Sequence, residues 1–531
     1  MDSPLISFLQ SPDAYAHSPD SVTHVQTHIS HVFIASPYVY KCKKSVDFGF
    51  LDYSSLEKRR KFCDREVELN RRLSDGIYLG VAAIVKDGDS YQLTDEKAAD
   101  DKVVEYAVKM KQLPEEYFLH SYLEQDTLSK KHLDRVADKL ADFYLSQQPD
   151  EEILQYGEIE SIKVNTDENF EQTRDFVDET IAENAYKAIQ YFTNQYFEKR
   201  GGLFERRVAQ KRIVDGHGDL HLEHIHITPD SVQIYDCIEF NDRFRYGDLA
   251  VDLAFLAMDL DFNDRWSDER YFIDQMAEKL DDPDLPKIID FYKCYRAYVK
   301  GKVKSLQSGE PEVPKKDRQR ARQTAQQYFD LSLRYALLGS RPSAIIFMGK
   351  VGTGKSTLAR HLHKKLSIEY FSTDEIRKRL AGLPLEERTP STKRDTLYSE
   401  KMSEQTYQQL LDKAESNIRA GKSIILDATF SSRSSREKLI KKLTSLNVQL
   451  LFVEAQAPEN IIKQRLKARE NQDDVISDAR IEDFDKLDRR YEPPAELEGK
   501  QLVEVATDRD LTNTIEQLYR ALAERNIITY S

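Results

Sequence analysis

A glycine-rich loop after an apolar run carries the clearest chemistry in this sequence of 531 residues. The run Ala344–Met348 leads into a GxxxxGK[ST] pattern made of Gly349, Lys350, Val351, Gly352, Thr353, Gly354, Lys355 and Ser356. Its glycines let backbone N–H groups surround phosphate oxygens, while Lys355 can reach the β- and γ-phosphates and Ser356 can ligate Mg²⁺. Thr357 follows in an amphipathic helix whose positive end would face the same anion. The loop therefore predicts a site for a nucleoside triphosphate such as ATP. The alternative is a glycine-rich turn that binds no ligand.

Two carboxylates follow later apolar runs. Asp374 comes shortly after residues 368–371, with Arg377 one helical turn further on, and Asp427 directly follows residues 424–426. Ligands bind at strand ends in parallel sheets. Asp374 there could accept the proton of an attacking hydroxyl, and Arg377 could orient an anionic substrate. Asp427 could hold Mg²⁺ through water. The alternative for Asp374 is a helix N-cap, a position that suits aspartate.

Arg465 and Arg469 share one face of a predicted helix at one-turn spacing. Such a pair could close over the transferring phosphate and neutralise its developing charge. A solvated basic face is the alternative for each arginine.

A second set of candidate residues lies in the segment HGDLHLEHI, residues 217–225, which DCIEF follows at residues 236–240. Asp219 could deprotonate a substrate hydroxyl, and Asp236 could coordinate Mg²⁺ at nucleotide phosphates. Because imidazoles suit zinc, a metal site is the alternative. Its candidate ligands are His217, His221, His224 and His226.

Residues 342–531 resemble the branch of P-loop kinases that includes zeta toxins, bacteriophage polynucleotide kinase and chloramphenicol phosphotransferase. The motifs GKVGTGKS, STDEIR, ILDATF, and RLKAR followed by SDA carry the resemblance. It implies that Asp374 is the general base, that Arg377 clamps the substrate, and that Arg465 and Arg469 belong to a lid. Acceptors in this branch range from nucleic acid ends to nucleotide sugars and antibiotics.

The amino-terminal half resembles the aminoglycoside phosphotransferase family, small-molecule relatives of the protein kinases. HGDLH, DCIEF and the later GDLAVDLA match its catalytic loop, metal-binding strand and helix start. The resemblance implies a phosphate-binding lysine, for which Lys43 is the choice and Lys41 the alternative, and a glutamate partner, Glu66. His224 stands where the family places a metal-binding Asn, and imidazole is a poor Mg²⁺ ligand.

Together the two halves resemble bacterial proteins described as bifunctional aminoglycoside phosphotransferase and ATP-binding protein. The expected fold class is α/β and α+β multidomain: a two-lobed protein-kinase-like domain, then a P-loop kinase domain with a parallel β-sheet between helices. The expected boundaries are a small lobe at residues 1–112, a large lobe at 113–338 and a P-loop domain at 339–531.

Composition narrows the class of protein further. The net charge of -14, without long basic runs, argues against binding of extended nucleic acid. Four scattered cysteines suggest neither disulfides nor a zinc site, and no segment predicts a signal peptide or a membrane helix. We therefore expect a cytoplasmic protein that does not enter the membrane. The sequence does not indicate an oligomeric state.

Three functions remain open at this point. The first is an Mg²⁺-dependent ATP phosphotransferase acting on a hydroxyl of a small molecule or nucleotide, with a second site around Asp219. In the second, the amino-terminal half is a non-catalytic module that senses a ligand and regulates the P-loop kinase. The third is an ATPase that works as a switch.

Overall fold

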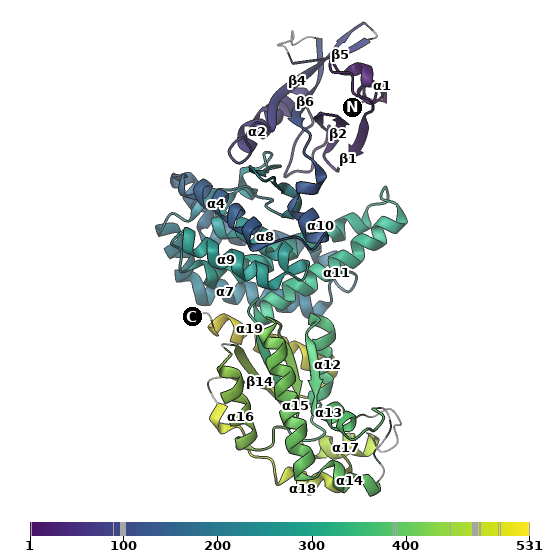
Figure 1. Cartoon of the computed structure of the whole chain (residues 1–531), viewed down its shortest axis with the longest axis vertical. Coiled ribbons are helices and arrows are strands. Elements are labelled where there is room, and N and C mark those ends of the chain that lie inside the picture. Colours follow the sequence, from purple (N-terminus) through teal and green to yellow (C-terminus); the bar gives the residue numbers. More distant parts are fainter. Residues whose placement is uncertain are drawn as a thin grey trace. The chain divides into compact units, whose positions relative to one another are not determined.

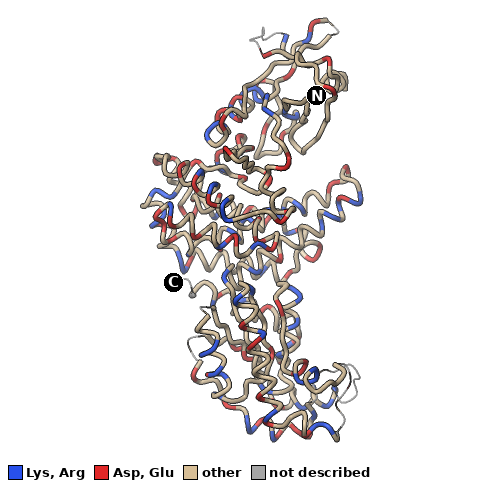
Figure 2. Tube along the Cα trace, viewed as in Figure 1, with Lys and Arg blue, Asp and Glu red and all other residues tan. Residues whose placement is uncertain are grey.

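The computed structural model describes most of the chain, in two compact units. The described residues are 1, 3–88, 90–95, 102–385, 387, 389, 391–446, 448–469, 476, 479–497, 499 and 501–529. Unit 1 comprises Met1–Asn165 and Gly201–Arg296, and unit 2 comprises Thr166–Arg200 and Ala297–Ser531. The expected boundaries after residues 112 and 338 stay predictions. Acidic and basic residues are interspersed along the described chain of both units (Figure 2).

The first part of unit 1 is a six-stranded antiparallel sheet in the order β1-β2-β3-β6-β4-β5. Its strands are β1 (Thr23–Gln26), β2 (Ser30–Ala35), β3 (Tyr38–Lys43), β4 (Tyr78–Asp87), β5 (Ser90–Thr94) and β6 (Val103–Lys111). Helix α2 (Leu56–Asn70) begins at the N-cap Ser55 and packs on β4 and β6. Cys63 and Val67 of α2 contribute to the core there, together with Val108 of β6. The sheet and this helix position the lysines of β3.

The second part of unit 1 is mainly helical (Figure 1). Its main helices are α3 (Leu119–Glu124), α4 (Lys130–Leu145), α8 (Leu249–Phe262), α9 (Trp266–Lys279) and α10 (Leu285–Gly309), the last of which extends into unit 2. Two small antiparallel pairs lie among them: β7 (Ile213–Asp215) with β10 (Tyr246–Asp248), and β8 (Ile225–Ile227) with β9 (Val232–Ile234). Helix α8 is almost entirely buried, which fits its apolar sequence.

Unit 2 contains a parallel five-stranded sheet in the order β12-β13-β11-β14-β15. The strands are β11 (Ser343–Met348), β12 (Glu369–Ser372), β13 (Ile424–Asp427), β14 (Gln449–Gln456) and β15 (Leu502–Ala506). Strand β11 is buried along its whole length, because it lies at the centre of the sheet with helices on both faces.

Alternation along β11 assigns its side chains to the two faces of the sheet. Ala344, Ile346 and Met348 share a core with α15 (Glu400–Arg419) and α16 (Arg433–Thr444). Ile345 and Phe347 point to the opposite face. The remaining helices of unit 2 include α11 (Lys315–Leu338), α12 (Lys355–Leu366), α13 (Thr373–Leu380), α14 (Ser391–Leu397), α17 (Glu459–Arg469), α18 (Phe484–Asp488) and α19 (Leu511–Thr529). The predicted fold class is confirmed, with a mixed α/β chain and a parallel sheet in its carboxy-terminal part.

A buried arginine fastens the segment that follows α18. Arg436 of α16 is fully buried; its Nε and Nη2 donate to Glu496, at 2.5 and 3.2 Å, and its Nη1 donates to the carbonyl oxygens of Phe430 and Glu492. Its loss would remove the side-chain donor of the Glu496 carboxylate and the guanidinium hydrogen bonds to two carbonyl groups. Such a substitution lowers stability strongly, because the remaining buried groups are desolvated and cannot form hydrogen bonds to water instead.

We therefore expect Arg436→Met to lower the free energy of unfolding of unit 2 by about 3 kcal/mol. Hydrogen exchange of the amides of β13 and β14 measures this. The matched control is Arg433→Met. Arg433 lies about one turn before Arg436 on the same helix, and its substitution removes only an exposed ion pair with Glu437. The control should cost about 0.5 kcal/mol or less. Equal effects of the two substitutions would contradict the role of Arg436.

Candidate active site

The phosphate loop of unit 2 joins β11 to α12 in a backbone conformation that requires glycine. Gly349, Gly352 and Gly354 have φ values of 134°, 82° and 93°. A Cβ on Gly349 would lie 2.5 Å from the carbonyl oxygen of Ala455. Lys355 is the first residue of α12, so the N-terminal end of this helix faces the space enclosed by the loop.

Two side chains from elsewhere in unit 2 hold this loop. Arg465 Nη1 donates to the carbonyl oxygen of Thr353 at 3.3 Å and to Thr507 Oγ1 at 3.1 Å. Thr507 Oγ1 in turn donates to the same carbonyl oxygen at 2.5 Å. Arg465 therefore supports the loop in this structure, and its predicted contact with the transferring phosphate stays a prediction. Thr507 was not identified from the sequence, because its role depends on a contact between distant segments.

Two further residues of the loop, Lys350 and Val351, contact other parts of unit 2. Lys350 forms an ion pair with Asp488 at 2.6 Å, so its side chain is directed to α18. Val351 packs against a small apolar cluster that includes Ile462 and Leu466. Their contacts with a nucleotide, and the Mg²⁺ contact of Ser356, stay predictions.

Asp374 lies in the first turn of α13, but it does not cap the helix. Ser372 is the N-cap, and its Oγ accepts hydrogen bonds from the backbone N–H groups of Asp374 and Glu375, at 3.2 and 3.4 Å. The N-cap alternative for Asp374 is therefore wrong. The carboxylate of Asp374 instead lies 3.5 Å from Arg377 Nη1, so the two residues predicted to act on the acceptor lie together.

Asp427 ends strand β13 next to both β11 and β12. Its register partners are Phe347 in β11 and Ser372 in β12. Oδ2 accepts a hydrogen bond from the Tyr370 hydroxyl at 2.7 Å, while Oδ1 is buried without a hydrogen-bond partner among the described residues. An unsatisfied buried carboxylate oxygen fits a group that binds a cation or its water. The pairing with Tyr370 was not predicted.

Positive charge is concentrated beside these carboxylates. Burial lowers the pKa of Arg469, as does the positive charge of Arg465 and Arg360, while the carboxylates of Asp374 and Asp427 act in the opposite direction. A guanidinium under such repulsion gains from an added anion. The contact of Arg469 with the transferring phosphate stays a prediction. Residues 477 and 478 of the SDA motif lie outside the described residues.

A cavity of about 350 Å³ adjoins the loop and the arginine pair. Its lining includes Gly354, Thr357, Arg465, Arg469, Thr507 and Leu511. The volume falls within the range of small-molecule sites, about 300 to 1,000 Å³. It can accept the part of a nucleotide that extends beyond the phosphates.

In unit 1, a side chain of α8 supports the predicted catalytic loop, the segment HGDLH at residues 217–221. Asp252 accepts hydrogen bonds from the backbone N–H groups of His217 and Gly218, at 2.5 and 2.8 Å. His217 is fully buried, with Nε2 2.9 Å from the carbonyl oxygen of Tyr235 and Nδ1 3.3 Å from the N–H of Asp219. Burial and the neighbouring His224 lower the pKa of His217 to about 3. The neutral ring therefore supports the loop that presents Asp219.

Both candidate lysines of β3 contact Glu66. Lys41 Nζ lies 3.0 Å from Glu66 Oε1 and 2.6 Å from Asp236 Oδ1. Lys43 Nζ lies 2.6 Å from Glu66 Oε2 and also contacts Glu239, which the sequence placed in the DCIEF motif without a role. Burial disfavours the charged form of Lys41, but the carboxylates of Asp236 and Glu66 outweigh it and raise its pKa. Both lysines are therefore cationic.

The two lysines differ in access to the cavity above Asp236. This cavity, of about 460 Å³, is lined by Lys41 and Asp236, by apolar residues of the sheet, and by residues 110–113 at the end of β6 and directly after it. Lys43 is only 1% exposed and does not line it. The geometry favours Lys41 as the residue that would contact a phosphate, and the assignment to Lys43 stays a prediction.

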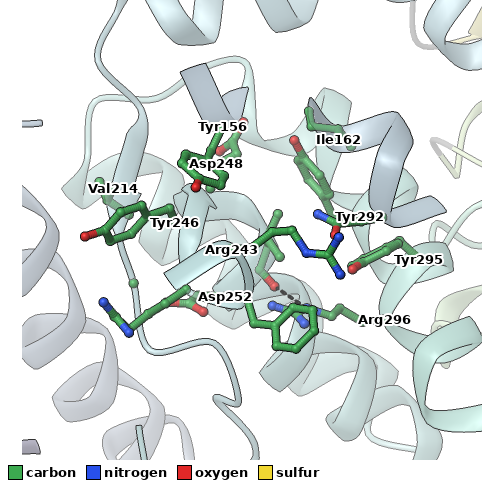
Figure 3. A pocket seen from close by; sticks show the side chains of 16 residues that line it. Tyr156, Ile162, Val214, Arg243, Tyr246, Asp248, Asp252, Tyr292, Tyr295 and Arg296 are labelled. Carbon is green, nitrogen blue, oxygen red and sulfur yellow. Dashed lines mark hydrogen bonds between the residues drawn. The ribbon is translucent and has the colours of Figure 1, made fainter. Parts of the chain in front are cut away.

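A smaller cavity lies behind the catalytic-loop candidate (Figure 3). Tyrosine and arginine side chains surround it, among them Arg243, Tyr292, Tyr295 and Arg296. Its volume is about 50 Å³, room for a few water molecules at about 15 Å³ each. It is too small for a nucleotide, so the larger cavity above Asp236 is the candidate site of unit 1.

Comparison with known proteins places the chain in a family. It is 30% identical over 440 residues to the uncharacterized proteins Rv2004c of Mycobacterium tuberculosis and Mb2027c of Mycobacterium bovis. These residues are 82% of this chain and 84% of each relative. The chain therefore belongs to the same family as these mycobacterial proteins. A family model described as "AAA domain" matches residues 345–494, and a P-loop domain there suggests ATP-dependent phosphotransfer.

Solved structures give weaker likenesses. A gluconokinase from Sinorhizobium meliloti is 17% identical, covering 36% of this chain and 96% of its own, with a TM-score of 0.25. The Mycobacterium tuberculosis APS kinase CysC is 18% identical, covering 34% and 98%, with a TM-score of 0.26. A choline/ethanolamine kinase family protein from Mesorhizobium loti is 9% identical, covering 62% and 99%, with a TM-score of 0.37. No helix among the described residues is long and apolar enough to cross a membrane.

The close approach at Gly349 gives a test of the phosphate loop. We expect Gly349→Ala to displace the loop and to weaken ATP binding there by about tenfold or more, equivalent to about 1.4 kcal/mol. The measurement is the MgATP concentration that protects residues 349–356 from hydrogen exchange. Gly382→Ala is the matched control, because Gly382 also has a positive φ, 65°, but no atom lies within 4 Å of its Cβ position. Unchanged protection in Gly349→Ala would contradict the assignment of the loop.

Proposed function

We propose that unit 2 transfers the γ-phosphate of ATP to a hydroxyl group of a small-molecule or nucleotide acceptor. The observation that carries the proposal is that three features lie at neighbouring strand ends and that a fourth, an arginine at the end of α17, lies near them. They are the glycine loop after β11, Asp374 after β12, Asp427 at the end of β13, and Arg469 within the electrostatic reach of both carboxylates. Each corresponds to one requirement of phosphoryl transfer.

In the proposed reaction the loop N–H groups and Lys355 hold the triphosphate. Asp374 accepts the proton of the acceptor hydroxyl, and Arg377, 3.5 Å away, orients the acceptor. Arg469 stabilises the charge that develops on the transferred group. Ser356 and Asp427 would hold Mg²⁺, which supplies further charge neutralisation when it is bound. The unpartnered Oδ1 of Asp427 fits this role.

The corresponding test removes the base and keeps its surroundings. We expect Asp374→Asn to lower the rate of phosphoryl transfer by about 10² to 10⁴-fold, the usual contribution of a general base, while ATP binding persists. The acceptor is first identified by incubating a metabolite extract with γ-labelled ATP and finding the compound that acquires the label. Glu375→Gln is the matched control, one residue further along the same helix, and should transfer at the normal rate. Full activity in Asp374→Asn would contradict the assignment.

Rapid ATP hydrolysis without an acceptor would instead favour an ATPase switch. Asp374 and Arg377 argue against it, since hydrolysis needs no residues to position an acceptor. Their adjacency supports transfer.

For unit 1 we propose a second nucleotide site, in the cavity above Asp236. Lys41 pairs with both Glu66 and Asp236, an arrangement that can hold phosphates between the lysine and a metal-binding carboxylate. The alternative, a ligand-sensing module that regulates unit 2, gains support from His224 in the place of an expected Asn. Binding of MgATP separates these two proposals.

We expect Lys41→Met and Lys43→Met to have different effects. In the full chain carrying Lys355→Ala, which disables the phosphate loop, Lys41→Met should weaken MgATP binding by about tenfold or more, as for a lost charge-assisted contact. Lys43→Met should mainly reduce stability, because it leaves Glu239 and Glu66 in the interior with one cation fewer. Calorimetric titration and thermal unfolding measure the two effects. No MgATP binding in the Lys355→Ala parent would favour the ligand-sensing module.

A further inference from the structure

Two histidines and one aspartate of unit 1 come together beside the cavity above Asp236. His221 Nε2 lies 3.3 Å from Asp219 Oδ2, and His224 Nε2 lies 3.5 Å from Asp236 Oδ2. One ligand atom from each of Asp219, His221 and His224 lies within 4.8 Å of the others. The two imidazoles are largely buried, with side-chain exposed fractions of 9% for His221 and 13% for His224, while the Asp219 side chain is 32% exposed.

The hydrogen bonding of His224 fixes which ring nitrogen is available. Its Nδ1 lies 2.9 Å from the backbone carbonyl oxygen of Asp219. A carbonyl oxygen can only accept, so Nδ1 carries the proton and Nε2 keeps its lone pair, directed toward Asp236. Metal-binding histidines characteristically donate their other N–H in this way.

The position of the Asp236 carboxylate agrees with this assignment of the His224 nitrogens. Lys41 Nζ contacts Oδ1 of Asp236, which leaves Oδ2 on the side of His224. The separation of 3.3 Å between His221 Nε2 and Asp219 Oδ2 also fits, because ligand atoms about 2.1 Å from a tetrahedral zinc ion lie about 3.4 Å apart. The other two histidines of the segment are engaged elsewhere. His217 contacts backbone groups through both nitrogens, and His226 Nε2 lies 3.1 Å from the carbonyl oxygen of Pro114.

We propose that unit 1 binds one divalent transition-metal ion through Asp219, His221 and His224, with Asp236 adjoining His224 Nε2 at 3.5 Å. Mixed imidazole and carboxylate ligands suit Zn²⁺, Co²⁺ and Mn²⁺, whereas Mg²⁺ prefers oxygen ligands alone. The site therefore selects Zn²⁺ or Co²⁺ over Mg²⁺. This proposal concerns unit 1 and does not depend on phosphoryl transfer by unit 2.

The proposal bears on the role of unit 1. An Asp219 carboxylate bound to a metal ion is a weaker base toward a substrate hydroxyl, because the positive charge of the ion lowers its affinity for a proton. A metal-loaded unit 1 would thus act as a metal- and nucleotide-binding module, or as a phosphotransferase only when the ion leaves Asp219 free. The ligand set, rather than the fold, decides between these functions.

The experiment uses the full chain without a histidine tag and without nucleotide, so that the phosphate loop adds no second metal site. Titration with CoCl₂ should give visible d–d bands that saturate at one Co²⁺ per chain, and ZnCl₂ should displace the Co²⁺ while a large excess of MgCl₂ should not. His224→Asn and His221→Asn should each weaken Co²⁺ binding by about tenfold or more, at least the cost of losing a supporting group. His28→Asn, an exposed histidine of the same unit, is the control and should bind normally.

Circular dichroism establishes that each variant is folded. If either cluster variant fails to fold, zinc-edge X-ray absorption of the unaltered protein counts the imidazole ligands directly and should find two. Absence of imidazole ligands, displacement of Co²⁺ by Mg²⁺, or normal binding by a folded His224→Asn would each overturn the proposal.

Discussion

The parallel order of β12, β13 and β11 is the constraint on which the candidate site of unit 2 depends. Parallel strands end at the same edge of a sheet, so residues that follow them gather although they are far apart in sequence. Phe347, Ser372 and Asp427 share one register level across the three strands. This places the phosphate loop, the first turn of α13 and the last residue of β13 around one space. The helices that cover both faces keep the strands in this register by burying β11 completely.

The candidate site of unit 1 depends on a different interaction, a buried group of side chains with opposite charges. Lys41 and Lys43 face three carboxylates, those of Glu66, Asp236 and Glu239. A lysine alone would lose its charge in such a place, but the paired carboxylates keep both lysines cationic. The group links the sheet, α2 and the DCIEF segment, so its geometry requires all three to be folded. Removal of one member leaves a buried charge without its partner, which is why each position is sensitive.

Much of the fold followed from local pattern. The apolar runs at residues 344–348 and 424–426 each lie within a strand. These signals are strong because burial on both faces demands continuous apolar sequence. Asp374 was located correctly after its strand, although the sequence left open whether it capped the helix. Ser372, two residues earlier, resolves this, because its side chain already accepts the N–H groups that a cap would satisfy.

Sequence pattern alone could not predict which side chains from distant segments contact each other. Arg465 was expected at the phosphate, but it contacts Thr353 and Thr507, and no periodicity pairs residues so far apart in the chain. Lys41 and Lys43 lie two apart on one strand face, so pattern alone could not separate them. The same limit applies to His224. Its position in the motif showed a departure from an oxygen ligand, but only the hydrogen bond from Nδ1 to Asp219 shows which nitrogen is free. Because that bond leaves Nε2 of His224 unprotonated, an imidazole that would weaken an Mg²⁺ site can serve as a ligand for a different ion. On this proposal, the chemistry of unit 1 depends on which cation Asp219 shares with the two imidazoles.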